Sequence, residues 1–153
     1  MRLFSFTAAL ALALDQISKL LVRQNLEHTQ SVPLIWGWLD FTHVHNYGAA
    51  WGVFAGQRVL LIVFTVFVVG FMLFTAREVA RKSRLSAVGF GLILGGALGN
   101  LIDRIWQGYV TDFLDLGSPI RFLQTFPVFN IADSALTVGV VLMMLSLILE
   151  KRE

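Results

Sequence analysis

Four long apolar segments limit what this chain can fold into. They run from Leu3 to Val22, Val59 to Ala76, Leu85 to Ile102 and Ile131 to Leu149. Each is long enough for a transmembrane helix, since crossing the hydrocarbon takes roughly 20 mostly apolar residues. Hydrophobic residues make up 56% of the chain and charged residues only 14%, which does not fit a soluble core. We therefore predict an all-α integral membrane protein with four transmembrane helices in one domain, residues 1–153.

The first apolar segment could be mistaken for a cleaved signal peptide. Arg2 precedes it, and Ala11-Leu12-Ala13 imitates a small-residue cleavage site. We reject that interpretation because the apolar pattern continues past Asp15 through Leu20-Leu21-Val22, as expected of a spanning helix with internal polar residues. The chain contains no Cys, so disulfides are excluded and helix packing alone must hold it together. The sequence Gly95-Gly96-Ala97-Leu98-Gly99 predicts a stripe of small residues for such packing.

The distribution of basic residues predicts the orientation in the membrane. Lys and Arg concentrate in short cytoplasmic segments of membrane proteins. Seven of the twelve basic residues lie at the N-terminus, in the second connection or at the C-terminus: Arg2, Arg77, Arg81, Lys82, Arg84, Lys151 and Arg152. Both termini are therefore expected in the cytoplasm, and the connections near residues 24–57 and 105–130 on the outer side. The net charge of +2 is explained by this pattern and indicates no nucleic-acid partner.

Most polar residues of interest fall in the outer half of the membrane or just above it. Ionisable groups at membrane depth are costly and normally face a protein interior or a water-filled cavity, so they indicate a functional site. Asp112 lies in the connection between the third and fourth helices, and Asp133 lies in the first turn of the fourth. That connection could fold back and bring the two carboxylates together. The residues in this group are Asp15, Asn100, Asp103, Arg104, Asp112, Asn130 and Asp133.

Several of these residues also have a purely structural interpretation. Asn130 and Asp133 have the spacing of a helix N-cap with an acidic partner. Asp15 and Lys19 lie four residues apart, so they could neutralise each other inside the bilayer. Asp103 and Arg104 point about 100° apart on a helix and must therefore find separate partners.

Other residues outside the four helices predict surface or interfacial positions. Asn46 to Gly52 could form a plain turn leading into the second helix, with small residues that allow close approach of a substrate backbone. The three histidines are expected at the surface, and the sequence contains no H-E-x-x-H pattern for zinc. Four tryptophans are expected at the outer membrane interface: Trp36, Trp38, Trp51 and Trp106.

The chain resembles the lipoprotein signal peptidases, or signal peptidase II family, over nearly its whole length. Five motifs occur in the expected order on the four spans. One departure is Trp51, where family members often carry Phe. The motifs are Asp15-Gln16-Ile17-Ser18-Lys19, Asn46-Tyr47-Gly48-Ala49-Ala50-Trp51-Gly52, Gly95 through Arg104 (Gly-Gly-Ala-Leu-Gly-Asn-Leu-Ile-Asp-Arg), Gly108-Tyr109-Val110-Thr111-Asp112-Phe113 and Phe129-Asn130-Ile131-Ala132-Asp133-Ser134.

The resemblance implies an aspartic endopeptidase of the bacterial plasma (inner) membrane. Such an enzyme removes the signal peptide of a diacylglyceryl-modified prolipoprotein just before the lipidated cysteine, with its active site on the extracytoplasmic side. Asp112 and Asp133 would form the catalytic dyad, and a small β-like platform would follow the first helix. No metal or other cofactor is expected. The protein is expected to be a monomer surrounded by membrane lipids. Residues implied to bind substrate or support the dyad are Asp15, Lys19, Asn46, Gly48, Asn100, Asp103, Arg104, Asn130 and Ala132.

Three other functions remain to be compared with this one. Ser18 and Lys19 suggest a serine protease, although adjacent helical residues diverge by about 100°. A small proton-conducting protein would also contain intramembrane acids, but it should carry polar residues through the inner half of the membrane, which is almost entirely apolar here. A structural subunit with capped helices would account for Asp133 and leave Asp15, Asp103 and Asp112 without a role.

Overall fold

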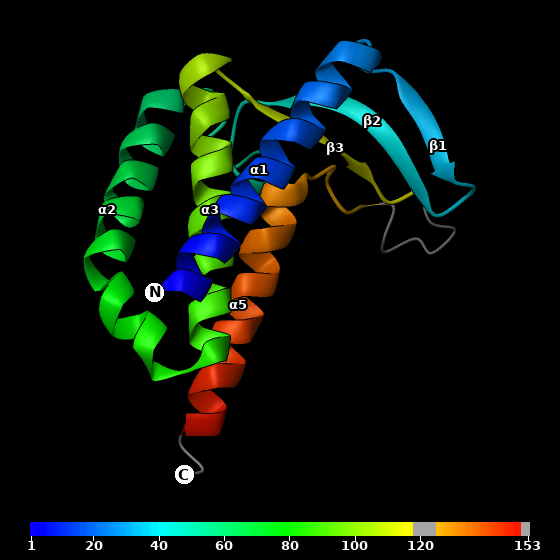
Figure 1. The fold of residues 1–153 in the computed structure, drawn as a ribbon. Coiled ribbons are helices and arrows are strands. Elements are labelled where there is room, and N and C mark those ends of the chain that lie inside the picture. The colour runs from blue at the N-terminus through cyan, green and yellow to red at the C-terminus, as the bar shows by residue number, and fades with distance from the viewer. Residues whose placement is uncertain (118–124, 151–153) are drawn as a thin grey trace.

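Four long helices dominate the computed structural model, which describes residues 1–117 and 125–150 (Figure 1). They are α1 (Arg2–Asn25), α2 (Arg58–Lys82), α3 (Arg84–Trp106) and α5 (Ile131–Glu150). All four are long and apolar enough to cross a membrane, which confirms the predicted spans. α1 and α2 continue beyond the apolar segments, to Asn25 and Lys82. Polar residues at a helix end can still take part in the backbone hydrogen bonds of the last turn.

Helix α3 lies at the centre of the bundle and packs against the other three helices. Its glycines explain how the helices approach so closely. A methyl group added to Gly95 would fall 2.5 Å from the backbone oxygen of Ala8 in α1, and one added to Gly96 would fall 2.5 Å from that of Ala132 in α5. The predicted small-residue stripe is therefore confirmed, with neighbouring glycines serving opposite helices.

Helix α1 buries one narrow stripe against this centre. Its buried residues follow one another every three or four positions, which is the spacing of a single helix face. The stripe is apolar in the first half of the helix, and in the second half it contains two charged residues before it ends at an apolar one. Its members are Phe4, Ala8, Ala11, Asp15, Lys19 and Val22.

The opposite faces of the helices expose large apolar side chains. Phe74 and Phe67 on α2 are 88% and 71% exposed. A soluble protein rarely exposes apolar surface on this scale, whereas lipid solvates it at no cost. The helix surfaces therefore fit a multi-pass membrane protein.

A three-stranded antiparallel sheet lies at one end of the bundle. Its strands are β1 (Ser31–Ile35), β2 (Leu39–Asn46) and β3 (Val110–Asp115), in the order β1-β2-β3. Figure 1 shows the sheet beside the end of α1 and the start of α5. The predicted β-like platform after the first helix is thus present, but it is incomplete without β3, which comes from the connection between α3 and α5. A short helical turn, η1 (Ala50–Gly52), follows β2.

Candidate active site

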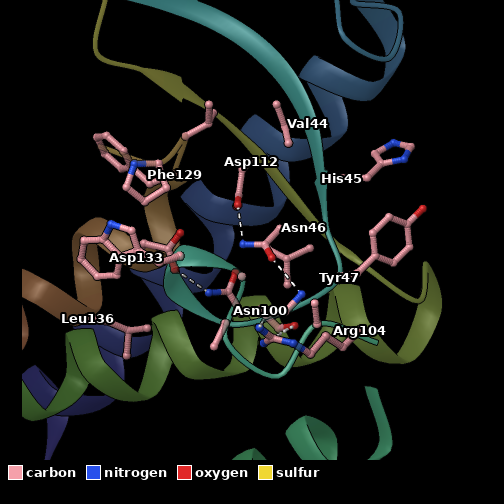
Figure 2. A pocket seen from close by; sticks show the side chains of 18 of the residues that line it. Val44, His45, Asn46, Tyr47, Asn100, Arg104, Asp112, Phe129, Asp133 and Leu136 are labelled. Carbon is pink, nitrogen blue, oxygen red and sulfur yellow. Dashed lines mark hydrogen bonds between the residues drawn. The ribbon is translucent and has the colours of Figure 1, made fainter. Parts of the chain in front are cut away.

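A cavity of about 620 Å³ lies where the sheet meets the helix ends, and both predicted catalytic aspartates line it. Asp112 comes from β3, and Asp133 comes from the first turn of α5. Leu114 and Phe129 form an antiparallel bridge that holds β3 against the segment entering α5. The connection therefore folds back as expected and brings the two carboxylates to one cavity (Figure 2).

Two asparagine side chains hold the Asp112 carboxylate. Asn46 Nδ2 donates to Asp112 Oδ2 at 2.9 Å, and Asn130 Nδ2 donates to Asp112 Oδ1 at 2.6 Å. Asn46 is itself fixed, because its Oδ1 accepts a hydrogen bond from the backbone N–H of Gly48. Each oxygen of Asp112 thus has a neutral donor, and no basic side chain binds it directly among the described residues.

Asp133 is held by Asn100 and by its own helix terminus. Asn100 Nδ2 donates to Asp133 Oδ1 at 2.8 Å. The backbone N–H of Asn130 donates to Asp133 Oδ2, and Asn130 Oδ1 accepts from the backbone N–H of Asp133. This reciprocal pair confirms the predicted N-cap. Capping occupies one carboxylate oxygen and leaves Asp133 still lining the cavity, so the structural interpretation does not exclude a functional one.

The environment of Asp112 raises the pKa of its carboxyl to about 7. Burial is the main cause, because it disfavours the charged form, and the negative charge of Asp133 adds to it. The hydrogen bonds from Asn46 and Asn130 act in the opposite direction by stabilising the carboxylate. The Asp112 carboxyl therefore titrates near neutral pH, so that the pair can hold a single proton there, as expected for two acids that share a cavity.

A buried cluster of charges lies directly behind the cavity. Lys19 is completely buried, and its Nζ lies 2.8 Å from Asp15 Oδ2 and 3.3 Å from Asp103 Oδ2. It also donates to Asn100 Oδ1 at 2.9 Å. The predicted Asp15–Lys19 neutralisation is confirmed, but the lysine does more, because it sets the orientation of the amide that donates to Asp133.

The supporting residues Asp103, Arg104, Gly48 and Ala132 each have a definite place. Asp103 and Arg104 find separate partners, as predicted. Asp103 Oδ2 accepts from the backbone N–H of Thr111, and Arg104 Nη2 donates to the backbone oxygen of Gly48. Gly48 has no room for a side chain, since a methyl group would fall 2.9 Å from the backbone oxygen of Val53. Ala132 is fully buried, and its backbone N–H donates to Asp15 Oδ1.

Our sequence reasoning missed three residues of the network. Arg23 donates to the hydroxyl of the fully buried Thr111 and lies 3.5 Å from Asp103, while Gln16 donates to Asp15 and Asp103. The spacing of Asp15, Lys19 and Arg23, four residues apart on one helix face, was a signal that could have found Arg23. Gln16 and Thr111 lie within the family motifs, but no spacing singles them out as members of the network.

The prediction that all three histidines lie at the surface is wrong for His43, which is only 5% exposed. Its Nδ1 contacts the backbone oxygen of Leu26 at 2.9 Å, and its ring packs against those of His28 and His45. The alternation of β2 turns it inward, towards the end of α1. His45 lines the cavity, and burial together with the charges of His28 and His43 lowers its pKa to about 4, so it presents a neutral ring.

The structure also bears on two kinds of alternative site. The Ser18 hydroxyl donates to the backbone oxygen of Asp15, and Lys19 contacts Asp15, Asp103 and Asn100, so these residues do not form a Ser-Lys pair. Within residues 1–117 and 125–150, no group of three or more His, Asp or Glu is arranged to hold a metal ion. A site that needs no cofactor stays a prediction.

Four membrane-length helices, with a cavity at one end that holds two carboxylates, define a multi-pass membrane protein with a candidate active site. The comparisons identify the family. The protein-family model described as signal peptidase (SPase) II matches residues 7–149 of the chain. The chain therefore belongs to the signal peptidase II family, and membership supports cleavage of lipoprotein signal peptides.

Two solved structures are similar to the chain over most of its length. One is a bacterial membrane enzyme structure determined by the in meso method at 2.3 Å resolution. It is 32% identical, with a TM-score of 0.87, and the match covers 95% of this chain and 87% of that one. The other, determined in the same way at 1.9 Å, is 33% identical with a TM-score of 0.83, and the match covers 93% and 90%.

Proposed function

We propose that this protein is an aspartic endopeptidase that uses Asp112 and Asp133 to cut diacylglyceryl-modified prolipoproteins just before the lipidated cysteine. The observation that carries the proposal is the cavity, in which two carboxylates from separate elements are each held by neutral asparagine amides. A raised pKa at Asp112 supports it, because an aspartic dyad works with one proton between two acids.

The reaction follows from that shared proton. The ionised carboxylate takes a proton from a water molecule, whose oxygen attacks the scissile carbonyl carbon. The protonated carboxyl donates its proton to the carbonyl oxygen, which gives a tetrahedral diol. When the carbon–nitrogen bond breaks, the carboxylate that is now ionised takes one diol proton, and the other carboxyl gives its proton to the leaving nitrogen. Peptide and water become acid and amine, and the dyad again holds one proton.

The position of the site suits a substrate that stays in the membrane. A signal peptide has a positive cytoplasmic start and an apolar stretch that crosses the bilayer, so its cleavage site emerges on the outer side. The cavity combines the dyad with apolar walls that include Leu136 of α5. The diacylglyceryl group can therefore remain in lipid while the peptide enters laterally.

The cellular setting of the proposal follows from the same reasoning. The protein would lie in the bacterial plasma (inner) membrane, with both termini in the cytoplasm and the cavity on the extracytoplasmic side. Its partners would be lipid-modified prolipoproteins and membrane lipids, with no nucleic acid. We further propose that residues 1–153 act as a single domain and as a monomer without cofactors.

Cleavage by the purified full chain in detergent tests this function. A diacylglyceryl-modified prolipoprotein and its unlipidated precursor are incubated side by side, and the new N-terminus is identified by mass spectrometry. We expect cleavage only of the lipidated protein, immediately before the modified cysteine. Equal cleavage of both substrates, or cleavage elsewhere, would remove the lipid-dependent part of the proposal.

The pH dependence of wild type and Asn46→Ala tests the shared proton. Activity should fall as pH rises through about 7, because Asp112 then loses the proton that it donates. Asn46 stabilises the ionised carboxylate, so its removal should raise the pKa of Asp112 and move the alkaline limb to higher pH. The measurement is kcat/KM against pH. Asn25→Ala is the control, since the Asn25 side chain, within residues 1–117 and 125–150, bonds only to the backbone oxygen of Leu21. An unmoved limb in Asn46→Ala would contradict the assignment.

A further inference from the structure

A second hollow lies at the end of the bundle away from the sheet. It has a volume of about 320 Å³ and lies between the start of α1 and the turn that joins α2 to α3. Figure 1 shows that α1 begins short of this turn. Its lining is mostly apolar and basic. The apolar residues are Met1, Leu3, Ala80 and Ala87, the basic ones are Arg81 and Arg84, and Ser83 completes the set.

The two arginines have no partner among the residues that the structure describes. Both are exposed, and within the described residues neither makes an ion pair or hydrogen bond, since the ion pairs found there all involve Asp15 or Asp103. The neighbouring charges are mostly positive as well. Arg2, Arg77 and Lys82 add to the positive field, and Glu78 is the nearby acid in sequence. A guanidinium group pairs best with a carboxylate or a phosphate in fork geometry, and here no carboxylate supplies it.

The hollow lies at the depth of lipid headgroups. α2 has 25 residues and, at about 1.5 Å per residue, is longer than the hydrocarbon core of roughly 30 Å. Arg81 is in its last turn and Arg84 begins α3, so both emerge where phosphates lie. The Ser83 hydroxyl is already bonded to Ser86 and Ser146, which leaves the arginines as the groups available for an anion.

We propose that this hollow binds the headgroup of an anionic phospholipid. Arg81 and Arg84 hold the phosphate, and the apolar floor of Leu3, Ala80 and Ala87 receives the glycerol backbone and the first carbons of an acyl chain. The mixed lining favours a lipid over a free anion, because a free phosphate has no apolar group that could contact the apolar part of the lining. Basic residues that only mark orientation would need no hollow between them.

Native mass spectrometry of the delipidated full chain tests this binding, with phosphatidylglycerol and phosphatidylcholine of the same acyl chains as probes. Wild type should retain one phosphatidylglycerol in preference to phosphatidylcholine. Arg81→Gln with Arg84→Gln should weaken that binding about fivefold for each arginine removed. The matched control is Arg77→Gln with Lys82→Gln, which removes the same charge from residues that do not line the hollow. Circular dichroism checks that both variants keep their helices.

Each result decides for or against the site. Loss confined to the Arg81/Arg84 variant supports it, together with partial loss in the variant that carries both Arg81→Lys and Arg84→Lys, which keeps the charge and removes the fork geometry. Equal loss in both double variants would show attraction by net charge alone and overturn it. Displacement of the lipid by inorganic phosphate at equal concentration would overturn the lipid assignment in favour of a free-anion site.

Discussion

Asp112→Asn and Asp133→Asn are each expected to abolish cleavage of a lipidated prolipoprotein. An amide can neither accept the proton of the attacking water nor return one to the carbonyl oxygen. Proton transfer by one positioned group accounts for about 10²–10⁴ in rate, and each substitution ends the exchange of one proton between two acids. The loss should therefore reach at least about 10³-fold in kcat, with binding of the substrate less affected.

The matched control for this experiment is Asp115→Asn. Asp115 ends the same strand as Asp112, does not line the cavity and accepts a hydrogen bond from Thr42. The Asp115→Asn substitution should leave the rate of cleavage near that of the wild type. Turnover is measured with purified proteins whose helical content and unfolding temperature match the wild type. Normal turnover in either Asn variant of the dyad would show that the two-carboxylate mechanism is wrong, and Asp133 would then be explained by its N-cap alone.

The sequence predicts the helices of this protein more fully than the sheet. Length and hydropathy suffice for four spans, because lipid forces each backbone hydrogen bond to close within its own helix. β3 lacks such a constraint. Its residues Val110 to Asp115 form a strand only because β2 supplies partners from 60 or more positions away, with Val44 opposite Asp112 and Asn46 opposite Val110. Pairing over that separation is not visible in a local pattern.

The site shows the same division between local and distant information. The capping relation of Asn130 and Asp133 and the pairing of Asp15 with Lys19 could be predicted from spacing, because both lie within one helical turn. The amide bridge from Lys19 through Asn100 to Asp133 could not be, since it joins three different helices. His43 was missed for a related reason. Its burial depends on the end of α1 lying against β2, and the alternation of the strand alone leaves open which face is covered.

Lys19→Met is expected to destabilise the folded protein strongly. Lys19 is fully buried and lies within 3.3 Å of the carboxylates of both Asp15 and Asp103. Methionine has a similar length and no charge, so two acids would remain buried with less compensation. Removal of one partner from a buried ion pair costs about 3–5 kcal/mol, because the remaining charge loses its counter-charge without regaining water. Denaturant unfolding in detergent measures the change, with Lys82→Met at the exposed end of α2 as a control near zero.

A second substitution separates the charge of Lys19 from its shape. If the loss comes from unbalanced negative charge, adding Asp15→Asn to Lys19→Met should restore part of the stability, since Asp103 still has Arg23 within 3.5 Å. The double variant should nevertheless cleave slowly, because Asn100 Oδ1 keeps only the longer hydrogen bond from Asn130 Nδ2, at 3.2 Å, to orient its amide towards Asp133. A Lys19→Met protein as stable as the wild type would mean that Asp15 and Asp103 do not need the charge of Lys19 in the folded state. The charge cluster would then be unnecessary for holding α1 against α3, and close packing at the glycines would have to hold them together alone.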